Sequence, residues 1–264
     1  MKKSQGRKVV KTKTPFEVED LRTRLAIGKN YNGFKKTYFA KYPEIKAKNT
    51  DRFWSYKFKT SEKLEDQDAM TRDKINYIIS NLPKGQSKIL DLGIGQGYLE
   101  QGLRQLGIAH KLYGIDISKK SIDRARKSFE GQFIESDVMK TDKLFNKSFF
   151  DVIVAIELIE HVQPTKIFDL YKKVKKLLRK DGIFIISTPL NEGLRYTNTN
   201  PSAHVREYTI PILTAEFKIS GFKIMKLKTF FAFQNFYILK RLIAKILDKW
   251  KPNNVVIVAK NRLS

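Results

Sequence analysis

The middle of this chain alternates short apolar runs with amphipathic segments, a pattern that few folds accommodate. The apolar runs occupy residues 88–92, 111–116, 132–136, 151–156 and 182–188, and segments of helical period lie around 98–107, 119–128 and 164–179. Strands that alternate with helices predict a parallel sheet with helices on both faces. The sequence therefore predicts an α/β fold.

Further elements flank this alternating region on both sides. Before it, a helix is expected from a Ser61 cap to about Leu82, where Pro83 follows. Its buried stripe is expected to hold Met70, Ile75, Ile78 and Ile79. After it, the pattern predicts a helix from Thr209 to Ser220, a strand at about 222–230, a helix at about 235–249 and a strand at 255–260.

Composition excludes several kinds of site. The chain has no cysteine, so disulfides, thiolate zinc sites and cysteine nucleophiles are ruled out, and any metal site must use histidine and carboxylate ligands. No apolar run approaches the roughly 18 residues of a membrane span. A length of 264 residues suits one large domain or one domain with appendages.

The positive charge is concentrated at the two ends of the chain. The formal net charge is +25, and residues 1–50 carry 14 basic and 4 acidic side chains, whereas residues 218–264 carry 11 and 1. We expect a basic arm at 1–14, an aromatic cap segment at 15–60, and a domain at 61–264 with a helical insertion at about 231–251. The basic start is not followed by an apolar stretch, which favours a cytoplasmic protein over a secreted one.

A glycine ladder follows the first apolar run. Residues 91–97 spell D-x-G-x-G-x-G, with glycines at 93, 95 and 97. Glycines at such a place let the backbone turn sharply and let a ligand approach it, at the sheet edge where open α/β folds bind ligands. A nicotinamide dinucleotide site would need a third glycine where Tyr98 stands. The turn therefore indicates a different nucleotide-type ligand.

Carboxylates end the next two strands. Asp116 closes the second apolar run, 19 residues beyond Gly97, where a carboxylate can accept hydrogen bonds from both ribose hydroxyls. Asp137 follows the third run and could accept a hydrogen bond from an adenine amino group. With Asp91, three acidic side chains are predicted at one sheet edge.

These motifs together resemble those of class I S-adenosylmethionine-dependent methyltransferases over residues 60–260. The matching pieces are DLGIGQG, YGIDIS, ESDV, DVIVAIELIEHV, LLRKDG and IFIISTP, in the family's order. The resemblance implies a Rossmann-like three-layer sandwich with a seven-stranded, mostly parallel sheet and an antiparallel last strand. It also implies S-adenosylmethionine as cofactor, with these residues around it: Asp91, Gly93, Gly95, Gly97, Asp116, Ile117, Asp137, Val138, Glu157 and Leu158.

Methyl transfer to oxygen needs positioning and a base more than covalent help. The sulfonium methyl group is a strong electrophile, so the protein holds the nucleophile in line and removes its proton. The base candidates are His161 and His204, each in a motif-like context. For His161 the alternative is a role in packing the cofactor loop.

A cation site is a second interpretation of the same segment. Glu157, Glu160, His161 and His204 form a ligand set suited to a divalent cation such as Mg²⁺ or Mn²⁺. This set resembles the metal site of small-RNA 2'-O-methyltransferases. The E-x-x-E-H-V string also resembles that of ubiquinone-biosynthesis O-methyltransferases, so it does not by itself select RNA.

The insertion helix has one apolar stripe. Phe236, Leu239, Leu242, Ile243, Ile246 and Trp250 recur at steps of three and four, and Lys240, Arg241, Lys245 and Lys249 fall mostly opposite. Such a helix can dock on its own core, contact an anionic membrane, or form a dimer contact. Periodicity does not choose among these three, and the oligomeric state stays open.

The sequence thus predicts a methyltransferase. Its expected reaction is O-methylation of a small-molecule, glycan or lipid-linked acceptor in the cytoplasm, with contact to the inner membrane face as one of the options left open. The first alternative is a cation-dependent RNA 2'-O-methyltransferase. The second is a non-catalytic scaffold that binds the cofactor.

Overall fold

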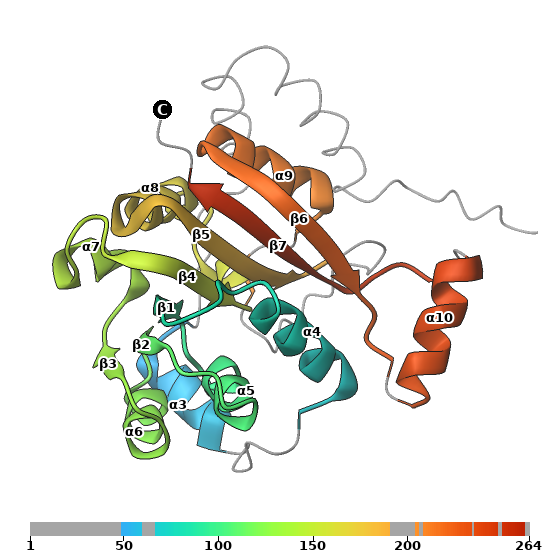
Figure 1. Cartoon of the computed structure of the whole chain (residues 1–264), viewed down its shortest axis with the longest axis horizontal. Helices are drawn as coiled ribbons and strands as arrows, with labels where there is room; N and C mark the ends of the chain where they lie inside the picture. The colour runs from blue at the N-terminus through green and yellow to red at the C-terminus, as the bar shows by residue number, and fades with distance from the viewer. Residues whose placement is uncertain are drawn as a thin grey trace, which may run out of the picture.

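The protein is built around one seven-stranded sheet (Figure 1). The computed structural model describes residues 49–59, 67–190, 204–205, 208–233, 235–247 and 250–261. The strand order is β3-β2-β1-β4-β5-β7-β6. The strands are β1 (Lys88–Leu92), β2 (Lys111–Asp116), β3 (Gln132–Glu135), β4 (Phe150–Ile156), β5 (Leu178–Pro189), β6 (Phe222–Phe230) and β7 (Asn254–Asn261).

Strand directions follow the expected pattern. The β1 strand pairs in parallel with β2 and β4, and β4 pairs in parallel with β5. The last strand, β7, lies antiparallel between β5 and β6. The predicted seven-stranded sheet with an antiparallel last strand is confirmed, and each predicted strand lies within a few residues of its observed bounds.

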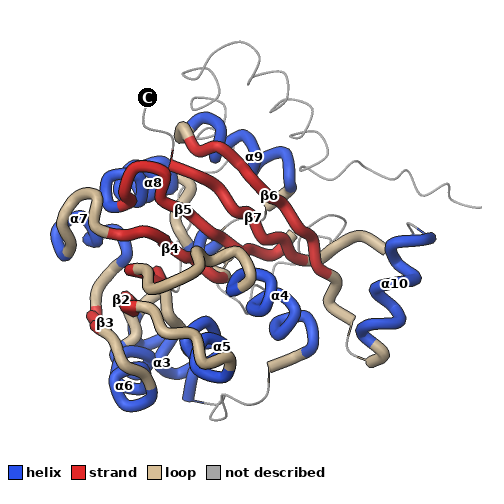
Figure 2. The backbone as a smooth tube through the Cα atoms, viewed as in Figure 1, coloured by secondary structure: helices blue, strands red, loops and turns tan. Residues whose placement is uncertain are grey.

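The central strands are apolar because both faces of the sheet are covered. Alternate residues of β1 face opposite layers: Ile89 packs with Val152 in one cluster, and Leu90 packs with Ile153 in the other. Helices complete both layers, as the tube in Figure 2 shows. They are α3 (Asp51–Lys59), α4 (Ala69–Ile79), α5 (Tyr98–Gln105), α6 (Lys119–Ser128), α7 (Thr141–Leu144), α8 (Ile167–Leu177), α9 (Ile210–Ile219) and α10 (Tyr237–Leu247).

The first predicted helix begins later than its sequence pattern suggested. It starts at Ala69, because Asp68 caps it by accepting a hydrogen bond from the Thr71 amide at 2.8 Å. The expected cap, Ser61, lies outside the described residues. Of the predicted stripe, Ile75, Ile78 and Ile79 are buried as expected.

Only part of the N-terminal region can be described. The predicted arm at 1–14 lies outside the described residues, as does most of the cap segment at 15–60. Its described end holds α3, which rests on α6 through a 3.0 Å hydrogen bond between the hydroxyl groups of Ser55 and Ser118. Arg124 of α6 also donates to the Phe58 carbonyl. This places α3 over the carboxyl ends of the central strands.

The insertion between β6 and β7 leaves the sheet at the same edge. Phe230 ends β6 opposite Asn254, which begins β7 and also lies opposite Pro189 at the end of β5. The α10 helix belongs to this connection and lies at the margin of the molecule (Figure 1). Among the described residues, no helix combines the length and the apolar character that crossing a membrane would require.

Candidate active site

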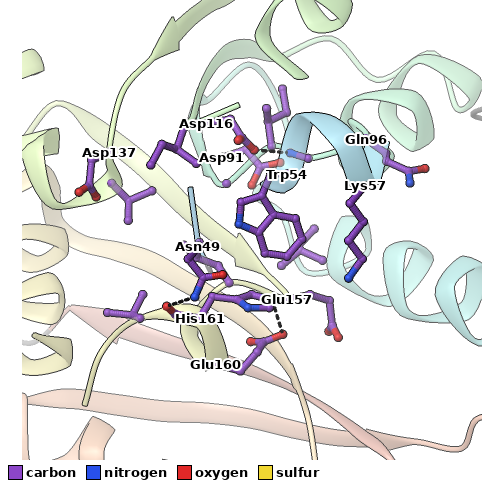
Figure 3. A pocket seen from close by; sticks show the side chains of 18 of the residues that line it. Asn49, Trp54, Lys57, Asp91, Gln96, Asp116, Asp137, Glu157, Glu160 and His161 are labelled. Carbon is purple, nitrogen blue, oxygen red and sulfur yellow. Dashed lines mark hydrogen bonds and ion pairs between the residues drawn. The ribbon is translucent and has the colours of Figure 1, made fainter. Parts of the chain in front are cut away.

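One cavity of about 580 Å³ opens at the carboxyl ends of the parallel strands. Figure 3 shows Asp91 and Asp116 on one side of it, Glu160 and His161 on the other, and the Trp54 ring between them. Nine of the ten predicted cofactor residues line it, Gly97 being the exception. Its wall includes Trp54, Lys57, Asp91, Gly93, Gly95, Asp116, Ile117, Asp137, Val138, Glu157, Leu158, Glu160, His161 and His204.

The glycine ladder forms a turn that other residues would strain. All three glycines have positive φ angles, +74° at Gly93, +54° at Gly95 and +75° at Gly97. A Cβ atom at Gly97 would lie 2.7 Å from the ring of Phe129. The ladder therefore needs glycine both for its backbone angles and for close packing.

Asp116 holds the turn from the neighbouring strand. Its Oδ2 accepts the Gly95 amide at 2.8 Å and its Oδ1 accepts the Ser118 amide at 2.7 Å. Burial raises its pKa, and these amide donors oppose that rise. A carboxylate offers about four acceptor positions, so two remain for hydroxyl groups in the cavity.

Asp91 interacts with a second buried acid that sequence analysis did not single out. Burial raises the pKa of Asp91 well above its usual range, and the nearby carboxyl groups of Glu100 and Asp116 raise it further. Burial also raises the pKa of Glu100 to about 7. Apart from the interaction between the two carboxyl groups themselves, Asp91 Oδ1 and Glu100 Oε2 have no hydrogen-bond partner among the described residues. These acids leave a buried acceptor atom for a donor in the cavity.

The adenine side of the predicted site is more open. Asp137 is exposed and accepts the Met139 amide at 2.8 Å, which begins the short 3₁₀ turn η1 (Val138–Lys140). Val138 and Met139 line the cavity beside it. The cradle of glycines, the free acceptor positions of Asp116 and the buried Asp91 oxygen together fit a nucleoside carrying a cationic amino-acid tail.

Glu157, at the end of β4, is engaged by three side chains. Its carboxylate accepts hydrogen bonds from Lys74 at 2.9 Å, Ser187 at 2.7 Å and Asn254 at 3.0 Å. These partners hold its pKa low against the effect of burial. Its φ angle of +51° is rare for a residue with a side chain and typical of functional turns.

The residues after Glu157 form a second group at the cavity wall. Glu160 is buried, and its Oε2 accepts the Thr188 hydroxyl at 2.9 Å. Burial and the charge of Glu157 raise its pKa well above the usual range. The rings of His161 and His204 lie 5.0 Å apart, and burial lowers the pKa of His204.

The structure brings together three of the four predicted metal ligands. One ligand atom each from Glu160, His161 and His204 lies within 4.8 Å of the others. Glu157 lies outside this group, because its carboxylate is turned to Lys74 and Asn254. The two predicted base candidates, His161 and His204, are neighbours in space although they lie 43 positions apart in the sequence.

A family model for the methyltransferase domain matches residues 40–227. The chain belongs to the methyltransferase family. With its sheet order and antiparallel β7, it is a class I S-adenosylmethionine-dependent methyltransferase by family and fold.

Individual relatives extend this assignment. A ubiquinone biosynthesis O-methyltransferase of Pelagibacter ubique is 37% identical over 118 residues, covering 44% of this chain and 47% of the relative. The aligned part therefore spans about half the length of that relative.

Solved structures share the fold at low sequence identity. An S-adenosylmethionine-dependent methyltransferase from Archaeoglobus fulgidus superposes with a TM-score of 0.60 at 20% identity, covering 78% of this chain and all but 1% of the other. A Burkholderia thailandensis didemethyltoxoflavin N1-methyltransferase, solved with bound S-adenosylhomocysteine, gives 0.58 at 18% identity, covering 79% and 87%.

Several residues of this methyltransferase site were not found from the sequence. Trp54 lies edge-on to His161 at 4.8 Å between ring centroids, and Asn49 donates to the His161 carbonyl at 3.1 Å. Burial lowers the pKa of Lys57, which also faces the cavity. The crowding of aromatic and basic residues before residue 60 was the available signal, but it did not identify these positions.

Proposed function

We propose that this methyltransferase transfers the methyl group of S-adenosylmethionine to an oxygen atom of a small-molecule acceptor. The observation that carries the proposal is that one cavity holds both the glycine ladder with Asp116 and the two histidines. A cofactor cradle and a candidate base thus face the same space. Glycan and lipid-linked acceptors are variants of this proposal.

The cofactor supplies an electrophilic methyl group on a sulfonium. Asp116 would accept the ribose hydroxyls through the positions that Gly95 and Ser118 leave free. Asp91 would accept from the amino group of the methionine part, because its Oδ1 has no partner other than Glu100 among the described residues. Leu158, which lies against Gly93, would pack near the sulfonium.

His204 is the better placed base of the two histidines. Because burial lowers its pKa, its imidazole is neutral at pH 7 and can accept the proton of an acceptor hydroxyl. His161 packs edge-on against the Trp54 ring, and its backbone carbonyl accepts a hydrogen bond from Asn49. We assign proton removal to His204 and orientation of the acceptor to His161.

Two observations support a small-molecule acceptor: the similar protein from Pelagibacter ubique and the mixed composition of the cavity wall. The similar Pelagibacter protein is an O-methyltransferase of ubiquinone biosynthesis. Aromatic and aliphatic side chains, Trp54, Phe58 and Leu158, share the cavity wall with the polar residues. This mixture suits an acceptor that presents one hydroxyl group on an apolar body.

The proposal is tested in two steps. Calorimetric titration with S-adenosylhomocysteine should give binding that Asp116→Ala weakens about 100-fold, because hydrogen bonds to a charged group contribute about 1.5–3 kcal/mol each. Asp123→Ala, an exposed acid on α6, should bind normally. A labelled-methyl screen over small-molecule, lipid and RNA extracts then identifies the acceptor class. Normal binding by Asp116→Ala would overturn the ribose assignment.

A cation-dependent reaction on RNA is the second candidate. It is favoured by the convergence of Glu160, His161 and His204 within 4.8 Å, a spacing that one divalent cation could bridge. The same three residues would then hold a cation that contacts a ribose hydroxyl. Chelator treatment separates the two candidates: loss of RNA labelling restored by Mn²⁺ supports the second, and chelator-insensitive labelling of small molecules supports the first.

A further inference from the structure

The α10 helix presents a broad apolar face to solvent. Ile246 is 80% exposed and Leu242 50% exposed, values far above those of core residues. Leu239, Leu242 and Ile246 follow one another at steps of three and four, so they share one face of the helix. Other exposed apolar residues of this segment are Phe236, Ile238, Leu247 and Trp250.

The opposite face of α10 fixes the helix to the protein. Tyr237 and Ala244 are buried. The Tyr237 hydroxyl donates to Asp73 of α4 at 2.9 Å, and Arg241 donates to the same carboxylate. Of the three options for the apolar stripe, docking on the core is therefore wrong: the stripe points outward. The docked face is the one with Tyr237, Arg241 and Ala244. The apolar face is a fixed feature of the surface.

The charge around this face is strongly positive. Residues 218–264 carry 11 basic residues and one acid, Asp248. Lys240 on α10 is exposed, and so are Lys223 and Lys226 on the adjoining edge strand β6. The nearest acid on α4, Asp73, is neutralised by Arg241 and Lys228. A partner for this surface must be both apolar and negatively charged.

We infer that α10 is an interfacial helix that binds an anionic lipid bilayer. Its 11 residues extend about 16 Å, which is about half of the hydrocarbon thickness, so it would lie in the plane of the interface. An apolar face bordered by basic residues and followed by Trp250 suits that position. A second copy of the chain fits less well, because it would bring two strongly basic segments together.

The position of α10 relates this surface to the active site. On α4, Asp73 binds α10, while the next residue, Lys74, binds Glu157 at the cavity. The insertion also leaves the sheet at the edge where the cavity opens. Bilayer binding would therefore hold the cavity edge near the lipid surface. This last consequence rests on the proposed function, whereas bilayer binding itself does not.

Vesicle sedimentation with the full chain tests the inference. The protein should bind vesicles containing phosphatidylglycerol and bind phosphatidylcholine vesicles much more weakly. Ile246→Gln should lower the partition coefficient about tenfold through lost apolar burial, and Lys240→Gln about fivefold through lost charge attraction. Leu106→Gln on the distant end of α5, where Leu106 is 57% exposed, is the matched control and should bind like the wild type.

Fluorescence adds a measurement that reports on α10 itself. The chain has two tryptophans, Trp54 in the cavity and Trp250 beside α10. Lipids with brominated acyl chains should quench emission in the wild type, and Trp250→Phe should remove that quenching. Equal binding to both vesicle types, or an equal loss in Leu106→Gln, would overturn the inference. So would a dimer, seen by light scattering, that Ile246→Gln dissociates without any vesicle binding.

The assay requires neither acceptor nor methyl transfer. Affinity for S-adenosylhomocysteine, measured on the same samples, shows whether the cofactor site is intact. A wild-type protein that binds S-adenosylhomocysteine normally but does not bind phosphatidylglycerol vesicles would therefore refute the bilayer surface alone. A wild-type protein that binds the vesicles but not S-adenosylhomocysteine would refute the proposed function alone.

Discussion

The two sides of the cavity are built by different means. On the cofactor side, between β1 and β2, the backbone dominates: positive φ angles at the glycines and amide groups bound to Asp116. On the histidine side, beyond β4, side chains dominate, and Glu157 collects Lys74, Ser187 and Asn254 from three other elements. The first side is a local structure and the second a tertiary one. Substitutions should therefore damage the two sides in different ways.

The largest effect is expected at His204. His204→Gln should lower kcat by about 100- to 10,000-fold, the usual contribution of a general base, and leave cofactor affinity unchanged. In the wild type, kcat should fall as the pH drops below the lowered pKa of His204, because the base is then protonated. Steady-state kinetics and calorimetry on one preparation check both points. A variant with normal kcat would remove His204 from the reaction.

Breaking the Lys74–Glu157 pair should have the next largest effect, on stability. Lys74 is 3% exposed, so Glu157→Gln leaves a buried ammonium without its countercharge. Because Glu157 also faces the cavity and is 34% exposed, we expect the lower end of the range for buried pairs, about 3 kcal/mol. Urea unfolding measures this loss.

A double variant distinguishes this effect from simple packing damage. With Lys74→Met added to Glu157→Gln, no uncompensated charge remains, and much of the lost stability should return. The exposed pair of Lys119 and Asp123 on α6 provides the control, since breaking it should change stability by less than about 1 kcal/mol. Additive losses in the double variant would contradict the pairing argument.

The buried acids on the cofactor side predict a pH dependence of stability. The pKa of Glu100 is raised to about 7 in the folded protein, so the folded state binds more protons than the unfolded state between about pH 4.5 and 7. Stability should therefore fall by about 3 kcal/mol as the pH rises through this range. Glu100→Gln should flatten that slope and raise the melting temperature at pH 8. A slope unchanged in Glu100→Gln would assign the titration to another group.

The contrast between the two sides also explains what the sequence could reveal. The ladder of Gly93, Gly95 and Gly97 and the strand-ending Asp116 lie in short segments whose geometry is local. The cavity wall therefore contains Gly93, Gly95 and Asp116 as their spacing predicted, although Gly97 does not line it. The same holds for the strands, since burial on both faces leaves continuous apolar runs.

The partners of Glu157 could not be predicted in this way. Lys74, Ser187 and Asn254 lie 83, 30 and 97 residues from it in the sequence, and only the folded sheet brings them together. The E-x-x-E-H string predicted that Glu157 belongs to a metal site. That string contains no sign of Lys74, which binds Glu157 in the folded protein. Similarly, the periodicity of α10 predicted an apolar face but not its orientation. That orientation is set by Asp73 of α4, which binds Tyr237 and Arg241 on the other face of the helix.

The smallest expected effect is that of replacing one glycine by alanine, and Gly95 and Gly107 offer a direct comparison. Gly95 and Gly107 have similar φ angles, +54° and +64°, but Gly95 lines the cavity whereas Gly107 follows α5 with nothing within 4 Å of an added Cβ. Alanine at either position should cost about 1–2 kcal/mol of stability, the strain of left-handed backbone. Only Gly95→Ala should also weaken S-adenosylhomocysteine binding, because the Gly95 amide is bound to Asp116. Equal affinities of the two variants for S-adenosylhomocysteine would mean that the turn at Gly95 connects β1 to α5 without contributing to cofactor binding.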